Sequence, residues 1–183
     1  MARVIVGMAM SLDGFVNDRN GDVGRLYPDM AAMRQTEQLQ EAIRSTGAVV
    51  MGRRAYEMGN GNDTGYEFQT PIFVLSHRPP ERAATGENDA LRFTFVTDGI
   101  AAAIARAKAA AGERDVTVVG GASTVRQCLA AGLAAEVQID VRSILLSDGL
   151  RLFDRRDGPP LELEPIGMTE SPGVTHPRYR PRP

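Results

Sequence analysis

The feature that most constrains the fold is an alternation of short β-branched runs with helical segments over the first two-thirds of the chain. The expected strands are 3–10, 48–51, 71–76, 92–96 and 115–119. The expected helices are 28–47, 53–58, 100–111 (with Asp98 as a candidate cap) and 123–131. Helical connections between successive strands favour right-handed crossovers. A mainly parallel sheet with helices on both faces is therefore predicted.

The last third of the chain carries strand patterns only, at 136–146, 161–168 and 174–180. With no helix for a crossover, the last two strands are predicted to form an antiparallel hairpin at the sheet edge, turning through residues 170–173. We expect one α/β domain over residues 1–183, with a mixed sheet of about eight strands. An apolar edge is usually paired or covered, so a homodimer through 161–179 is also predicted.

Composition excludes several classes of protein. The chain has 183 residues, 43% of them hydrophobic, and a net charge of −2, which is typical of a globular domain without a nucleic-acid partner. No apolar run near the N-terminus approaches the ~20 residues that span a bilayer, so no membrane segment is expected. Cys128 cannot form an internal disulfide, and two histidines leave too few ligands for a structural zinc site. We expect a core cysteine, no metal and a cytoplasmic setting.

Three predicted strands end in residues that suit phosphate oxygens. Residues 120–124 (GGAST) lead from a strand into a helix, residues 52–54 (GRR) do the same with two arginines, and residues 76–78 (SHR) end a third strand. Glycines allow close backbone approach, helix starts present free N–H groups, and arginine pairs with phosphate. The alternative for 120–124 alone is a tight turn without a ligand. Because ligands of open α/β sheets bind beyond the carboxyl ends of strands, the three junctions together predict a phosphorylated, nucleotide-sized ligand.

The expected strand that begins at residue 136 places polar side chains on one face. These side chains are Glu136, Gln138, Asp140 and Arg142, and the face is either solvated or lines a substrate site. His77 and His176 have no obvious serine or cysteine partner in the sequence. A hydrolase triad is therefore not predicted, and structural roles are expected for both histidines.

Two aspartates lie near the first strand and helix. Asp13 precedes Gly14 and is either a turn residue or a substrate contact, at the start of a long polar loop typical of a lid or binding loop. Asp29 directly precedes a helical pattern and is predicted to cap that helix.

Several short motifs occur in the order and spacing of one known superfamily. They are SLDGFV (11–16), MGRR (51–54), VLS (74–76), VGGA (119–122), LLSDGLRLF (145–153), GVTH (173–176) and RYR (178–180). The chain resembles the dihydrofolate reductase superfamily from about residue 4 to residue 180. Within it, the chain is most similar to the branch of the reductase domain of bifunctional riboflavin-biosynthesis deaminase-reductases.

The resemblance implies an NADPH-dependent reductase whose cofactor lies across the sheet. It assigns cofactor phosphates to Gly52, Arg53 and Arg54, and the adenosine 2′-phosphate to Ser76, His77 and Arg78. It assigns the pyrophosphate to Gly120, Gly121, Ala122, Ser123 and Thr124. Ala9 would contact the nicotinamide carboxamide through its backbone, and Val16 would pack on the ring.

The resemblance leaves the substrate side open. Dihydrofolate reductases place a carboxylate near their first helix for protonation, which corresponds to Asp29, and Asp140 or water is the other proton route. Asp13 and Gln138 are candidate substrate contacts. The HxE and PCxxC motifs of a zinc deaminase do not occur, so deamination is not expected. The predicted substrate is a small pyrimidine-like, pterin-like or carbonyl compound. The alternatives are dihydrofolate itself, a flavin-binding protein, or a non-catalytic nucleotide-binding protein on the same fold.

Overall fold

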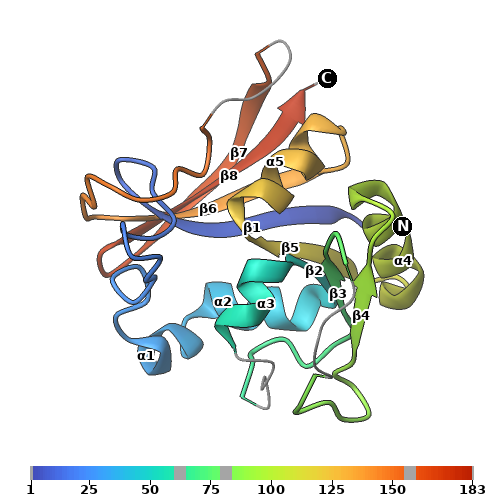
Figure 1. Cartoon of the computed structure of the whole chain (residues 1–183). Helices are drawn as coiled ribbons and strands as arrows, with labels where there is room; N and C mark the ends of the chain where they lie inside the picture. Colours follow the sequence, from blue (N-terminus) through green and yellow to red (C-terminus); the bar gives the residue numbers. More distant parts are fainter. Residues whose placement is uncertain (1, 60–64, 79–83, 155–159, 183) are drawn as a thin grey trace.

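The computed structural model describes residues 2–59, 65–78, 84–154 and 160–182, and within these ranges it contains eight strands and five helices (Figure 1). The strands are β1 (Val4–Ser11), β2 (Thr46–Gly52), β3 (Ile72–Leu75), β4 (Phe93–Val96), β5 (Asp115–Gly120), β6 (Glu136–Arg142), β7 (Glu162–Ser171) and β8 (Val174–Arg182). The helices are α1 (Met30–Arg34), α2 (Glu37–Ser45), α3 (Arg53–Met58), α4 (Ile100–Ala111) and α5 (Ala122–Ala130).

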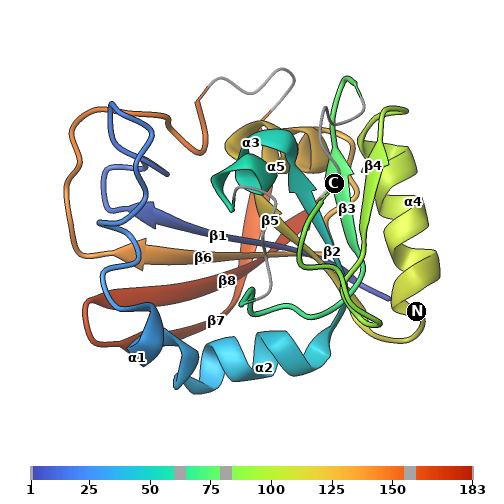
Figure 2. The ribbon, with the colours of Figure 1, turned by 60° about the horizontal axis from the view of Figure 1, so that its bottom comes forward.

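The described strands form one sheet in the order β4-β3-β2-β5-β1-β6-β8-β7. The first six strands in this order, β4-β3-β2-β5-β1-β6, are mutually parallel, and β8 is antiparallel to both β6 and β7. Figure 2 shows the hairpin of β7 and β8 beside β6, with α1 and α2 below the hairpin in this view. The predicted single α/β domain, with a mainly parallel sheet and a C-terminal antiparallel hairpin, is confirmed.

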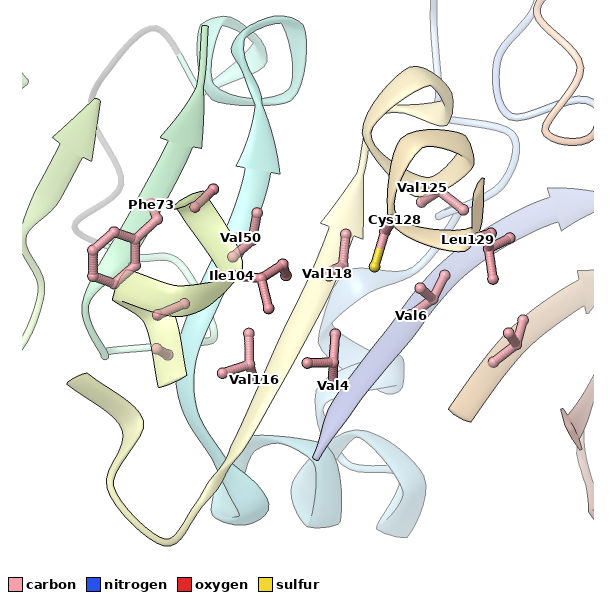
Figure 3. Close-up of a cluster of buried hydrophobic side chains, with 14 of the residues drawn as sticks. Val4, Val6, Val50, Phe73, Ile104, Val116, Val118, Val125, Cys128 and Leu129 are labelled. Carbon is pink, nitrogen blue, oxygen red and sulfur yellow. The ribbon is translucent and has the colours of Figure 1, made fainter. Parts of the chain in front are cut away.

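The larger hydrophobic core lies between the sheet and the two helices α4 and α5. Strands β1 and β5 contribute alternate valines, such as Val6 and Val118, which are fully buried. Figure 3 shows these valines facing Ile104 of α4 and Val125 and Cys128 of α5. Cys128 is thus a core residue, as its isolation in the sequence predicts.

A second, smaller core lies on the opposite face of the sheet. Val49 of β2 and Val74 of β3 are fully buried there and pack in one cluster with Tyr56 of α3 and with Leu39 and Ile43 of α2. Strands β2, β3 and β5 are therefore covered on both faces, which explains why their sequences are nearly continuous apolar runs.

The helix expected over 28–47 is wrong in its extent. The chain forms α1 and then α2, because the Thr36 side chain accepts a hydrogen bond from the Leu39 backbone and starts a new helix. Strand β2 begins at Thr46 rather than at residue 48, directly after α2. Asp98 does not cap α4: the cap residue is Gly99, at φ +91°, while Asp98 pairs with Arg106 at 2.8 Å.

Strand β6 is also shorter than expected and ends at Arg142. The following residues turn away because they pair with the loop after β1, where Leu12 N–H donates to Ile144 C=O and Val16 N–H to Leu150 C=O. In the described part of the chain, no helix has both the length and the apolar character needed to cross a membrane.

Candidate functional site

The three phosphate-type junctions predicted from the sequence lie at one edge of the sheet. Because β2 is the neighbour of both β3 and β5, the carboxyl ends of the three strands are adjacent. A Cβ atom placed on Gly52 would lie 2.6 Å from Thr124 Oγ1 and 3.2 Å from the Gly121 nitrogen. The 52–54 and 120–124 junctions are therefore in direct contact, and only glycine fits at position 52.

Each of these two junctions opens a helix. Gly121 is the cap residue of α5 and Gly52 that of α3, and neither helix start receives a side-chain capping hydrogen bond. A Cβ on Gly121 would meet no heavy atom within 4 Å, so there is open space beside the backbone. The Gly120–Gly121 peptide bond is cis, and Gly120 has φ +129°. Uncapped N–H groups facing open space suit the oxygens of a phosphate.

The side chains of the two junctions differ in how far they reach solvent. Arg54 and Ser123 are exposed, whereas Thr124 and Ala122 are buried. Arg53 forms an ion pair with Glu57 at 2.6 Å. The exposed guanidinium of Arg54 is therefore the charged group of this junction most accessible to an anion.

At the third junction, the serine hydroxyl is used within its own turn. Ser76 is buried and its Oγ donates to the Arg78 carbonyl at 2.6 Å. His77 and Arg78 are exposed beyond it. The turn thus presents two basic side chains at the surface next to β2.

Ala9 and Val16, the predicted nicotinamide contacts, are both buried. Ala9 is 3% exposed on β1, and its register partner on β6 is Asp140. Val16 is 7% exposed and packs in the larger core, with its N–H bonded to the Leu150 carbonyl. Contact of Val16 with a ligand stays a prediction.

Two motifs that are far apart in the sequence form one unit around the loop after β1. The Asp13 carboxylate accepts hydrogen bonds from the Ser11 hydroxyl and from the backbone N–H groups of Leu146 and Ser147. These bonds, the one from Ser11 first, lower the pKa of Asp13 below its usual range. Arg151 lies over the ring of Phe15, with its Cζ 4.5 Å from the ring centroid. Asp13 therefore has a structural role, and its contact with a substrate stays a prediction.

Asp29 caps α1, as its position in the sequence predicts. Its carboxylate accepts the Ala32 N–H at 2.9 Å, and the residue is exposed. A role as a catalytic acid stays a prediction.

The polar face of β6 divides into two separate networks. In the first, at the amino end of the strand, the Glu136 carboxylate accepts hydrogen bonds from Arg178 Nε at 2.6 Å and Gln138 Nε2 at 2.8 Å. Arg3 Nη1 lies 3.6 Å from the other carboxylate oxygen, Glu136 Oε2. Burial raises the pKa of Glu136, but these donors and positive charges outweigh it, so the pKa is lowered overall. The Gln138 amide, a predicted substrate contact, donates within this network.

The second network lies at the carboxyl end of β6 and includes Asp140. Its Oδ1 is 2.6 Å from His176 Nδ1, and His176 Nε2 is 2.8 Å from the Ser171 hydroxyl. The expectation that His176 has no serine partner is wrong. The serine and the aspartate come from two different strands, so no local sequence pattern brings the three together.

Tyr27 is a further residue of this region that the sequence does not reveal. Its phenol hydrogen-bonds with the Ala9 backbone, and burial, followed by the negative charge of Asp140, raises its pKa to about 12. Tyr27 lies in an irregular segment without hydrophobic periodicity, so only the tertiary structure places it beside β1 and β6.

Other reactive groups do not contribute to this site. Burial raises the pKa of the Cys128 thiol to about 11, so the cysteine stays protonated at neutral pH. Among residues with a described position, no three His, Cys, Asp or Glu side chains are grouped closely enough to hold a metal ion. A shallow hollow lined by residues such as Arg25 and Asp148 contains none of the junction residues.

Comparisons with known proteins agree with the fold. Residues 2–173 match the family model of the RibD C-terminal domain. The chain is 23% identical over 156 residues to the uncharacterized protein YyaP of Bacillus subtilis strain 168, covering 82% of this chain and 80% of that protein.

Two crystal structures illustrate the structural likeness. A putative riboflavin biosynthesis protein from Shewanella sp. PV-4 superposes with a TM-score of 0.80 at 25% identity, with both chains covered completely. A bifunctional diaminohydroxyphosphoribosylaminopyrimidine deaminase/5-amino-6-(5-phosphoribosylamino)uracil reductase from Thermotoga maritima gives a TM-score of 0.74 at 16% identity. That match covers 99% of this chain and 57% of the bifunctional one.

Proposed function

Since the chain belongs to the RibD C-terminal domain family, we propose that it is an NADPH-dependent reductase of a small heterocyclic or carbonyl compound. The substrate class favoured is a pyrimidine, because relatives with this fold include a 5-amino-6-(5-phosphoribosylamino)uracil reductase. Similarity to the family supports an oxidoreductase. The identities of the cofactor and of the substrate are our proposals.

The contact between the starts of α3 and α5 carries the proposal for the cofactor. Two uncapped helix starts meet at Gly52 and Gly121, with open space beside Gly121 and an exposed arginine at position 54. Two neighbouring helix starts without a side-chain cap fit the two phosphates of a dinucleotide. His77 and Arg78, exposed at the next strand end, add the cations that a 2′-phosphate requires, which favours NADPH over NADH.

The reaction follows from where the remaining residues lie on β1 and β6. A bound nicotinamide ring supplies a hydride from its C4 atom to an electrophilic carbon of the substrate. In this chain, the Ala9 backbone would orient the carboxamide, while Asp140 lies on the neighbouring strand in register with Ala9. The proposal therefore puts the cofactor phosphates at β2 and β5 and the substrate in front of β1 and β6.

Cofactor binding can be measured by titrating the fluorescence of NADPH and of NADH. We expect wild type to prefer NADPH, and Arg54→Ala to weaken binding about 10- to 100-fold through loss of a charge-assisted contact. Gly121→Val fills the open space and should abolish binding. The matched controls are Arg44→Ala, on the exposed side of α2, and Gly65→Val, where a Cβ also meets nothing within 4 Å. A wild type that ignores NADPH or prefers NADH would contradict the proposal.

Turnover separates the reductase from the alternatives on the same fold. NADPH oxidation is followed with 5-amino-6-(5-phosphoribosylamino)uracil, dihydrofolate and 4-nitrobenzaldehyde. Oxidation with the pyrimidine supports the proposal, whereas tight binding of NADPH without oxidation of any substrate indicates a non-catalytic binding protein. Fast reduction of dihydrofolate that Asp29→Asn abolishes would instead identify a dihydrofolate reductase.

A further inference from the structure

We infer that Asp140, His176 and Ser171 form a proton relay that delivers a solvent proton to the substrate of the proposed reductase. The inference rests on the proposed function and adds the source of the proton. Asp140 is the catalytic residue of the relay, and the other two act through it as positioning and proton-supplying residues.

The relay is built by strand register across three neighbouring strands. Gln138 pairs with Arg178 and Arg142 pairs with Val174, so Asp140 lies opposite His176 on β8. On the other side of β6, Asp140 is in register with Ala9 of β1. The three groups therefore run across the sheet from the hairpin toward the position proposed for the nicotinamide.

Exposure gives the relay a direction. The Asp140 side chain is 40% exposed and that of His176 is 14% exposed. The carboxylate beside Ala9 is thus the group that a substrate can reach. The imidazole is the less exposed group and is hydrogen-bonded at one ring nitrogen to Asp140 and at the other to Ser171.

The hydrogen-bonding roles follow from the chemistry of the partners. An ionised carboxylate only accepts, so His176 carries its proton on Nδ1 and donates it to Asp140 Oδ1. Nε2 of the neutral ring then accepts the Ser171 hydroxyl proton, and in the imidazolium form Nε2 donates to the Ser171 oxygen instead. Both protonation states of His176 keep both hydrogen bonds, which is what a relay requires.

Titratable and charged groups from the neighbouring elements lie near the relay. Tyr27, whose pKa is about 12, stays a neutral phenol near Asp140, and Glu136 and Arg178 neutralise each other further along β6 and β8. Thr169 of β7, opposite His176, accepts a hydrogen bond from Gln38 of α2. Other charged neighbours among the described residues are Arg142, two residues further along β6, Glu170, next to Ser171 on β7, and Glu67, which acts on Tyr27.

The proton balance of the reduction closes through these groups. Reduction of a C=N or C=O bond needs one proton at nitrogen or oxygen for each hydride added to carbon. His176 passes its Nδ1 proton to Asp140 while Nε2 takes the Ser171 hydroxyl proton and the Ser171 oxygen takes a proton from solvent. The Asp140 carboxyl group then gives its proton to the substrate atom, so one solvent proton is consumed per turnover. The neutral imidazole returns to its Nδ1–H tautomer by proton exchange with solvent before the next turnover.

Hydrolase triads consist of the same three residue types, but here a different member of the three faces the proposed substrate position. A triad directs the serine oxygen at the substrate, whereas in this chain the aspartate is the member beside Ala9. The geometry therefore points to proton delivery at Asp140 and not to nucleophilic attack by Ser171.

Kinetics of NADPH oxidation with the pyrimidine substrate test the catalytic part. We expect Asp140→Asn to lower kcat about 100- to 10,000-fold, with the KM for NADPH unchanged. Formate or acetate should partly restore kcat in Asp140→Ala, which a structural role would not allow. His176→Gln should lower kcat at least about tenfold and give a pH profile of kcat that differs from that of wild type. Glu170→Gln, a carboxyl-to-amide change on β7, is the matched control and should leave kcat unchanged.

Imidazole NMR tests the hydrogen bonds without any cofactor or substrate. The chain has only two histidines, so exposed His77 is an internal reference for His176. We expect the His176 Nδ1 proton to give a downfield resonance protected from exchange in wild type. This resonance should disappear in Asp140→Asn while the His77 signals stay unchanged.

The outcomes separate the relay from the function on which it rests. If wild type oxidises NADPH but Asp140→Asn retains its kcat, the relay is wrong and the proposed function stands. If wild type turns over no substrate, the proposed function fails and the relay fails with it. Hydrolysis of 4-nitrophenyl acetate that Ser171→Ala abolishes would also overturn the relay, since it would make Ser171 the reacting group.

Discussion

The parallel part of the sheet and the C-terminal hairpin differ in how they are stabilised. All seven residues of β2 are buried, because helices cover both faces of that strand. In β7 only Glu164 and Ser171 are even half-buried, and the apolar side chains of Leu163, Ile166 and Met168 are exposed. The parallel part folds around apolar cores, whereas the hairpin joins it through β8 and two polar networks on β6.

The difference also separates two parts of the proposed chemistry. The junctions proposed for the cofactor lie where buried parallel strands end in glycines and helix starts. Ser171 and His176, by contrast, come from the hairpin and meet Asp140 of the parallel part at its border. The contrast teaches that the proposed cofactor site depends on the buried parallel strands, whereas the proposed proton relay depends on how the less buried hairpin docks against β6.

The largest expected effect comes from a charge in the parallel core. Val118 of β5 is fully buried, and Val118→Asp places an unpaired carboxyl group there, which costs several kcal/mol, comparable with the ~5–15 kcal/mol that stabilises a typical domain. We expect no cooperative unfolding transition in circular dichroism. Met58→Asp, at an exposed position of α3, should unfold like wild type. A well-folded Val118→Asp protein would show that β5 is not central.

The exposed edge of the hairpin predicts a second large effect, on assembly. We propose that β7 pairs with a second copy of the chain, since its apolar side chains are otherwise uncovered. Ile166→Glu should raise the dimer dissociation constant at least about 100-fold, or ~2.8 kcal/mol. Light scattering measures the change, and Met58→Glu, at an exposed methionine of α3, is the control. A wild type that is monomeric at micromolar concentration would contradict this assembly.

The polar border between the two regions predicts a smaller, pH-dependent effect. Glu136 is 5% exposed and its partner Arg178 is 46% exposed, so solvent weakens the pair. Arg178→Ala should lower the free energy of unfolding by about 1–3 kcal/mol at pH 7. The exposed pair of Arg180 and Glu164, at 3.5 Å, is the control and should contribute less.

The sign of the pH dependence follows from the lowered pKa of Glu136. A lowered folded-state pKa stabilises the protein above the unfolded value of about 4.3, and this stabilisation is lost as the pH falls through the folded value. In urea titrations, the difference between wild type and Arg178→Ala should therefore narrow below about pH 4. A difference that stays constant down to pH 2 would show that the pair does not control it.

The smallest expected effect concerns α1, beside the border. Asp29→Ala removes the cap and should cost about 1 kcal/mol in thermal or urea unfolding. Asp29→Asn keeps a capping oxygen and should unfold within about 0.5 kcal/mol of wild type. Equal losses in the two variants would show that the charge matters more than the cap.

Much of the fold was predictable because the signals are local. The β-branched runs of the parallel strands and the lack of helices after residue 136 predict the sheet and its hairpin. The split at Thr36 was not predicted, because a capping threonine interrupts a helical pattern without breaking its periodicity. Of the candidate site, the glycine junctions were visible as motifs, whereas the partners of Asp140 were not.

The sequence by itself determined which segments are strands, which strand ends carry glycine and arginine, and that Cys128 belongs in a core. These properties depend on residue types at short spacing along one chain segment. Only the tertiary structure decided that Asp13 joins the 11–17 and 144–152 loops, and that Tyr27 lies beside Ala9. It also decided that Asp140, His176 and Ser171 meet. Side chains 36 residues apart, such as Asp140 and His176, come within 2.6 Å through strand order and register, which depend on the packing of the whole sheet.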